Sequence, residues 1–164
     1  MSEAVKFGWL SPVIGNRWSD FEPIVMFQEQ HILPTALQHF DSLWIADHFY
    51  GFDSPTDPFM EAWTTLSALA ATTKKIRLGA LVTSTSYRNP ALLAKMVASV
   101  DIISKGRVTL GIGAGWYQQE YEQYHFDYQE KAAERIYRLE EAVRLIKTMW
   151  TEERATYKGK YFDV

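Results

Sequence analysis

The sequence contains no cysteine, which excludes disulfide bonds and thiolate chemistry. It has no apolar run near the roughly 20 residues that a membrane-spanning helix needs. The segment MSEAVKFGWLSP has no cationic stretch leading into an apolar one, so we expect no signal peptide. A formal charge of −3 at pH 7 gives no basic surface of the kind that binds nucleic acid. These absences favour a cytoplasmic protein with neither a membrane nor a nucleic-acid partner.

The sequence does contain ample material for a core. Of its 164 residues, 47% are hydrophobic and 15% are aromatic, including six tryptophans. A chain of this length can bury a substantial core, and this composition is typical of a folded protein. We therefore expect a single domain over residues 1–164.

Short apolar runs alternate along the chain with longer segments of helical period. The runs predict strands at residues 5–10, 42–46, 76–83 and 108–112. The longer segments predict a helix after each strand, the first capped by Ser19 or Asp20 and the others over about residues 58–73, 90–103 and 131–150. Because a proline inside a helix removes a hydrogen bond, we expect a kink or two shorter helices at Pro34.

Capping residues support these helix boundaries. Asp57-Pro58 and Asn89-Pro90 each place a capping side chain before a proline at the first helical position, and Gly106 stands where a helix C-terminal glycine is expected. Helical spacing predicts two buried faces: Leu93, Met96, Val97, Val100 and Ile103 in the third helix, and Ile136, Leu139, Val143, Ile146 and Trp150 in the fourth. The final TYKGKYF segment resembles a hairpin that turns at Gly159.

Four successive strand-helix units predict an α/β fold with a parallel sheet and right-handed crossovers. Two architectures have this pattern. One is an open doubly wound sheet, and the other is part of a (β/α)₈ barrel. The order of elements alone does not separate them.

Three segments carry a family resemblance: LWIADHF at residues 43–49, the stretch from EAWTTL to WYQQEY at residues 61–121, and the stretch from ERIYRL to KGKYF at residues 134–162. Here the sequence resembles the luciferase-like monooxygenase superfamily, particularly its deazaflavin-dependent oxidoreductases. The resemblance implies a (β/α)₈ TIM barrel of about 250 residues, of which these four βα units correspond to the N-terminal half. A half-barrel leaves strand edges and an apolar face uncovered. We therefore expect a homo-oligomer, association with a second half-barrel, or a chain that is a fragment, a truncated gene product or an engineered piece.

The resemblance places Asp47 and His48, which follow the second strand, beside the reactive ring of the cofactor. It implies that the histidine takes part in catalysis or in ring positioning. An imidazole can give or take a proton near neutral pH. On the alternative interpretation, Asp47 caps a loop and His48 packs against Phe49 and Tyr50.

Leu81, Val82 and Thr83 end the third strand. Related deazaflavin enzymes have a non-proline cis peptide here, in a bulge that supports the back of the ring, and by position it is the Leu81–Val82 bond in this sequence. The alternative is an ordinary buried strand. We expect residues 83–86 to form a polar loop that lines the mouth of a pocket.

A glycine-rich segment, GIGAG, closes the fourth strand at residues 111–115. It is not the dinucleotide-binding GxGxxG motif, because its third glycine comes one residue too early. The resemblance implies that Gly113, Ala114, Gly115 and Trp116 contact the cofactor, since small residues let the backbone approach a ligand closely. The alternative is a tight strand-to-loop turn.

Three positions depart from the relatives that the sequence resembles. Trp116 stands where several deazaflavin dehydrogenases have a glutamate assigned as general acid, although an indole can stack on a ring or a substrate. Phe52 stands where they have a tryptophan. Ala114 stands where luciferase has an arginine for the flavin phosphate, which weakens the case for FMN.

We therefore expect an oxidoreductase that uses the reduced deazaflavin coenzyme F420 for hydride transfer to or from a small organic substrate. An FMN-dependent monooxygenase and a non-catalytic half-barrel are the alternatives. We expect no metal site, since the sequence has neither an HExxH motif nor paired cysteines. The remaining histidines, His31, His39 and His125, have no expected role.

Overall fold

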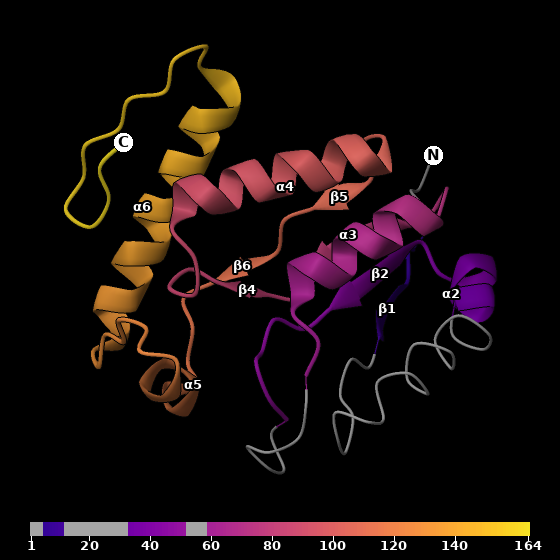
Figure 1. Ribbon diagram of the computed structural model, residues 1–164, viewed down its shortest axis with the longest axis horizontal. Helices are drawn as coiled ribbons and strands as arrows, with labels where there is room; N and C mark the ends of the chain where they lie inside the picture. Colours follow the sequence, from indigo (N-terminus) through magenta and orange to yellow (C-terminus); the bar gives the residue numbers. More distant parts are fainter. Residues whose placement is uncertain (1–4, 12–32, 52–58) are drawn as a thin grey trace. The chain divides into compact units, whose positions relative to one another are not determined.

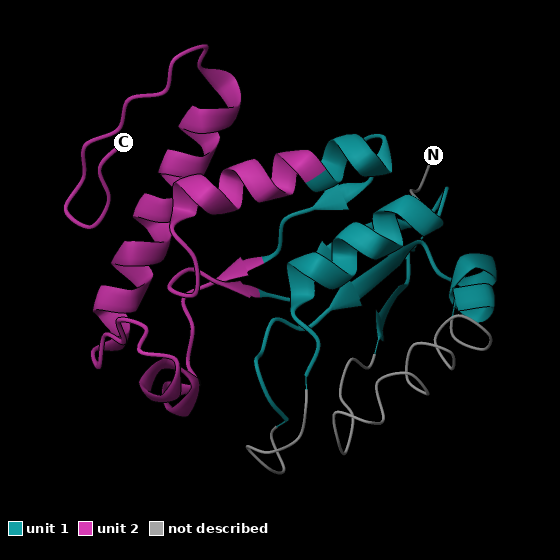
Figure 2. Ribbon diagram, in the orientation of Figure 1, with its two compact units in different colours: residues 1–82, 100–111 teal, residues 83–99, 112–164 magenta. Residues whose placement is uncertain are grey.

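A computed structural model describes residues 5–11, 33–51 and 59–164 of the chain (Figure 1). The contacts divide the chain into two compact units (Figure 2). Unit 1 consists of Met1–Val82 and Val100–Gly111, and unit 2 of Thr83–Ser99 and Ile112–Val164. The expectation of a single domain over residues 1–164 stays a prediction.

Unit 1 is built on a parallel sheet of four short strands: β1 (Gly8–Ser11), β2 (Ser42–Ile45), β3 (Arg77–Ala80) and β5 (Val108–Thr109). They lie side by side in their order along the chain, β1-β2-β3-β5. A doubly wound sheet reverses its strand order at a switch point, and these four strands show no reversal. In a barrel each strand pairs with the one before it. The strand order therefore favours the barrel architecture.

The packing of β2 explains two glycines of the sheet. Helix α3 (Ala62–Thr72) packs against β2 and β3 (Figure 1), and Leu43 and Ile45 of β2 are buried. Trp44 points to the opposite face, as alternation along a strand requires. An added Cβ at Gly8 or at Gly79 would overlap its indole. Glycines on both neighbouring strands therefore make room for one large ring.

Arg107 ties the end of α3 to the start of β3. Its guanidinium donates to the carbonyl oxygens of Ala70, Thr73 and Ile76, each at 2.9 Å. The last carbonyls of a helix have no partner within it, and a cation there also opposes the negative end of the helix dipole. Burial lowers the pKa of Arg107, but a guanidinium remains charged at neutral pH.

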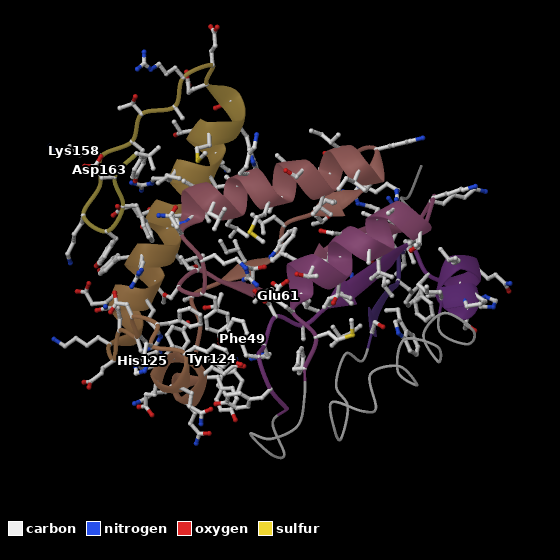
Figure 3. The ribbon with its side chains drawn as sticks, viewed as in Figure 1. Phe49, Glu61, Tyr124, His125, Lys158 and Asp163 are labelled. Atoms are coloured by element: carbon white, nitrogen blue, oxygen red, sulfur yellow. The ribbon has the colours of Figure 1, made fainter. Side chains whose placement is uncertain are left out.

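Unit 2 contains a parallel pair of strands, β4 (Thr83–Ser84) and β6 (Ile112–Gly113), together with helices α5 (Gln118–Gln123) and α6 (Ala132–Thr151). Helix α4 (Pro90–Ser104) begins in unit 2 and ends in unit 1. The last residues form a hairpin in which the backbones of Lys158 and Asp163 pair in an antiparallel β-bridge (Figure 3). The N–H of Gly159 donates to the carbonyl of Phe162 at 2.9 Å. The expected hairpin is confirmed, whereas α5 was not predicted.

The predicted start of α4 is confirmed, and that of α3 is wrong. The Oδ1 atom of Asn89 accepts from the N–H of Ala91 at 2.8 Å, and α4 begins at Pro90. Residues 59–61, which were predicted to be helical, do not lie in a helix, and α3 begins at Ala62. Its cap is Glu61 (Figure 3), whose carboxylate accepts the N–H groups of the next turn that have no helical partner.

Some predicted boundaries of the first two helices lie outside the described residues, namely Ser19, Asp20, Asp57 and Pro58. Pro34 is the second residue of α2 (Leu33–His39). A proline in the first turn of a helix removes no internal hydrogen bond.

Three predicted core positions are wrong. Ile136 and Trp150 of α6 are 57% and 45% exposed, and Ile103 of α4 is 48% exposed. The buried residues of α6 are Ala142, Leu145 and Ile146. The helix is covered only along these middle turns, so apolar residues toward its ends stay in contact with solvent.

Candidate functional site

The carboxyl ends of β2 and β3 bring two of the predicted segments to one edge of unit 1. Ile45 pairs with Ala80 in parallel register, and the N–H of Leu81 donates to the carbonyl of Ile45 at 2.8 Å. Asp47 and His48 follow β2, and Leu81 and Val82 follow β3. In barrel folds this edge carries the functional groups.

The loop after β2 holds one buried and one accessible polar group. Asp47 is 2% exposed, whereas His48 is only half-buried. The imidazole meets the ring of Phe59 edge to face, with 6.1 Å between the ring centroids. Phe49 comes next along this loop (Figure 3). The histidine ring is thus held by an aromatic neighbour and still has an accessible surface.

The segment after β3 contains the expected cis peptide bond, Leu81–Val82. The side chains of Leu81 and Val82 are 49% and 43% exposed, although residues 78–80 and 83–85 on either side are buried. The alternative interpretation, an ordinary buried strand, is therefore wrong at these two positions. Two adjacent large apolar side chains meet solvent at the carboxyl edge of the sheet.

Residues 83–85 do not form the polar loop that was expected. Thr83 and Ser84 make up β4, and the side chains of Thr83, Ser84 and Thr85 are all buried. Thr85 donates twice to the carbonyl of Gly113, from its N–H at 3.0 Å and from its hydroxyl at 2.7 Å. Thr85 therefore holds the glycine-rich segment, and the three buried side chains do not line a mouth.

Packing within the chain explains two glycines of the GIGAG segment. An added Cβ at Gly111 would overlap the carbonyl oxygen of Ala80, and at Gly115 it would overlap the hydroxyls of Tyr121 and Ser84. Gly115 also has φ +76°, which favours glycine. These contacts support the tight-turn interpretation for both positions. Contact of Gly113, Ala114 and Gly115 with a cofactor stays a prediction.

Trp116 presents a flat apolar surface directly after this segment. It is 63% exposed and stacks on Tyr117, with 5.1 Å between the centroids and 19° between the planes. Stacked indole and phenol rings are suited to contact with another flat ring.

Unit 2 contains a buried polar network that the sequence pattern did not predict. The hydroxyl of Tyr87 donates to the carboxylate of Glu120, and the hydroxyls of Ser84 and Tyr121 share a hydrogen bond of 2.6 Å. Glu120 and Tyr121 are both fully buried. Burial raises the pKa of the Tyr121 hydroxyl, so it stays protonated at neutral pH. The only local signal was the mixture of charged and aromatic residues in α5.

The structure therefore brings His48, Leu81 and Val82 to one edge of unit 1, and it places residues 113–116 in unit 2. A cavity shared by His48, Val82 and Gly115 stays a prediction. Across the described ranges, no three Asp, Glu or His side chains are grouped to hold a metal ion. No helix in the same ranges is long and apolar enough to cross a membrane.

Comparisons with known proteins agree on one family. The luciferase-like monooxygenase family is matched by residues 38–164. The F420-dependent glucose-6-phosphate dehydrogenase of Kineococcus radiotolerans is 38% identical over 128 residues, which are 77% of this chain and 37% of that protein. The corresponding protein of Gordonia bronchialis is 30% identical over 99% of this chain and 46% of its own length. The chain thus spans less than half the length of these relatives.

Solved structures share the fold. The oxygenating constituent of 3,6-diketocamphane monooxygenase from Pseudomonas putida, in complex with FMN, has a TM-score of 0.78 at 22% identity, covering 99% of this chain and 44% of that one. An F420-dependent secondary alcohol dehydrogenase in complex with an F420–acetone adduct has a TM-score of 0.77 at 23% identity, covering 96% and 46%. The expected fold class, half of a luciferase-like (β/α)₈ barrel, is confirmed.

Proposed function

Because the chain belongs to the luciferase-like monooxygenase family, we propose that it is an oxidoreductase using the reduced coenzyme F420 for hydride transfer to or from a small organic substrate. The observation that carries this proposal is the exposed apolar pair Leu81 and Val82 beside the loop of Asp47 and His48. The relatives named F420-dependent dehydrogenases support the choice of cofactor.

The residues at this edge fit a flat, largely apolar ring. Leu81 and Val82 offer adjacent apolar side chains to solvent in a stretch that is otherwise buried, and removing such surface from water favours binding. The deazaflavin ring, when bound, supplies the carbon that carries the hydride. The protein contributes binding, orientation and exclusion of water.

Each polar group of the loop has a proposed role. His48 would hold or move a proton at one of its imidazole nitrogens, because its ring is fixed by Phe59 and remains accessible. The buried carboxylate of Asp47 would fix the loop that carries this imidazole. We further propose that Gly113, Ala114, Gly115 and Trp116 contribute contacts to the cofactor, Trp116 through its exposed indole. Thr83 is fully buried and would contribute to the cofactor site from behind Leu81 and Val82.

FMN is the second candidate cofactor. The similar fold of an FMN-bound monooxygenase favours it. Against it stands Ala114, which has no guanidinium to make charge-assisted hydrogen bonds with a flavin phosphate. A non-catalytic half-barrel, and association with a second copy or a complementary half-barrel, also remain proposals, as does a cytoplasmic location.

Titration with F420 and with FMN, each followed by fluorescence, tests the proposal. We expect F420 to bind more tightly than FMN. Val82→Asp should weaken F420 binding by about tenfold or more, since it places a charge against an apolar ring. Leu92→Asp is the matched control, because Leu92 is 55% exposed on α4. Tight FMN binding without F420 binding would overturn the choice of cofactor, and no binding of either would favour the non-catalytic alternative.

A further inference from the structure

Helix α5 is short, yet it carries two fully buried residues with polar side chains. It spans six residues, and Glu120 and Tyr121 within it are both 0% exposed. A helix of this length has little stability of its own. Its position must therefore come from the contacts of these side chains with the rest of unit 2.

Both residues contact the segment that begins at β4. Glu120 accepts a hydrogen bond from Tyr87, and Tyr121 shares one of 2.6 Å with Ser84. The rings of Tyr87 and Tyr121 also lie 5.1 Å apart. Helix α5 is thus joined to residues 84–87 by two buried hydrogen bonds and one ring contact.

The Ser84–Tyr121 hydrogen bond lies directly beneath Gly115. An added Cβ at Gly115 would overlap both hydroxyls, so the backbone of Gly115 packs closely against the Ser84 and Tyr121 hydroxyls. Thr85 holds Gly113 through two hydrogen bonds to its carbonyl. The glycine-rich segment is therefore supported at Gly113 by Thr85 and at Gly115 by Ser84 and Tyr121.

We propose that Tyr121 and Ser84 are positioning residues, whose hydrogen bond sets the backbone of residues 113–116 for contact with the cofactor. The role of F420 as the bound cofactor depends on the proposed function, whereas the positioning of the backbone by Tyr121 and Ser84 does not. An apolar side chain would fill this part of the core without needing a hydrogen-bond partner, whereas a buried hydroxyl needs one. A direct hydrogen bond has the advantage that it fixes both distance and direction.

The test compares Tyr121→Phe and Ser84→Ala with the control Tyr137→Phe, whose ring is 57% exposed on α6. Amide hydrogen exchange is measured by mass spectrometry for peptides covering residues 112–117 and 132–151, and F420 affinity by fluorescence titration. We expect exchange in residues 112–117 to rise by about tenfold in both test variants, with α6 unchanged. The F420 dissociation constant should rise by a similar factor. The double variant should add little to Tyr121→Phe, since that variant already removes the hydroxyl that contacts Ser84 and Ser86.

Each other outcome has a defined meaning. Exchange that rises equally in α6, or that matches Tyr137→Phe in residues 112–117, overturns the positioning role. Local exchange that rises with unchanged F420 affinity removes the link to the cofactor. If the unaltered protein binds no F420 while local exchange still rises, the proposed function fails and the positioning of the backbone stands. Should Tyr121→Phe not fold, Ser84→Ala alone decides.

Discussion

Gly106 and Gly115 both have positive φ, 83° and 76°, but their surroundings differ. An added Cβ at Gly106 meets nothing within 4 Å, whereas at Gly115 it would overlap two buried hydroxyls. At Gly106 only the backbone conformation resists a side chain. At Gly115 the backbone conformation and the packing both resist it.

We predict that Gly106→Ala lowers the free energy of unfolding by about 1 kcal/mol. Gly115→Ala should lower it by about 3 kcal/mol, since overpacking adds roughly 1–3 kcal/mol to the same backbone strain. Urea denaturation followed by circular dichroism measures both values. Equal losses at the two positions would contradict the packing described around Gly115.

Residue-scale predictions from sequence depended on how local the signal was. The family resemblance was sufficient for the cis bond at Leu81–Val82, because the residues that carry it are contiguous. The burial of Glu120 could not be predicted, because its partner Tyr87 lies 33 residues away. No local pattern distinguishes a buried glutamate from a solvated one.

At the scale of elements, the C-terminal hairpin is fixed to α6 by carboxylates. Glu141 accepts the N–H groups of Lys160 at 3.1 Å and of Tyr161 and Phe162 at 2.9 Å. Burial acts to raise the pKa of Glu141, but these three N–H groups outweigh it and lower the pKa. Glu134 accepts from the hydroxyl of Tyr161 and from Lys160, which lower its pKa as well.

We predict that acid releases the hairpin. A carboxylate whose pKa is lowered in the folded state contributes stability above its unfolded pKa, about 4.3, and loses it as the pH falls through the folded pKa. The amide chemical shifts of Lys160, Tyr161 and Phe162 should therefore change with a midpoint below that of an ordinary glutamate.

Glu141→Gln is the control for this titration, because it keeps the shape of the side chain and removes its charge. It should remove the part of the titration that comes from Glu141, leaving the part from Glu134, and increase amide exchange in the hairpin. A midpoint above the ordinary value would contradict the hydrogen bonds assigned to Glu141. The pKa of Lys160 is raised, mainly by its contact with Tyr161. Its contribution is therefore lost only at alkaline pH, outside this range.

The start of a helix was predictable where the residue that caps it was of a typical capping type. Asn89 and Pro90 form such a start, and α4 begins there. The same pattern at Asp57 and Pro58 gave the wrong start for α3, because Glu61 caps the helix further along. Glutamate is not a preferred capping residue, so its role became visible only from its hydrogen bonds to Trp63 and Thr64.

At the scale of the whole molecule, the four-stranded sheet has β1 and β5 as its outer strands within the described part of the chain. Leu10 of β1 is 51% exposed, and Phe7 just before it is 62% exposed. An apolar edge strand is a template for pairing with another chain. The exposed edge therefore favours self-association.

We predict that the apparent mass in light scattering rises with protein concentration. Leu10→Lys should reduce this rise, because a charged side chain on an edge strand opposes pairing. Leu37→Lys is the matched control, since Leu37 is 45% exposed on a helix, α2, and not on a strand. A monodisperse monomer at every concentration would contradict the prediction.

The overall class of fold was predictable from the alternation of apolar runs and helical periods. The order of the strands was not, because hydrophobic periodicity records which faces are buried and carries no information on which strand is the neighbour. The pairings of Gly8 with Ser42, Ser42 with Arg77 and Leu78 with Val108 supplied that information.

These same pairings bear on how the chain folds during synthesis. Within the four-stranded sheet, each strand after β1 pairs with the previous strand of that sheet, and none has to wait for a segment from the far end of the sequence. Since translation delivers the chain from its N-terminus and folding slows as contacts become more distant in sequence, each βα unit can dock on its predecessor as it leaves the ribosome.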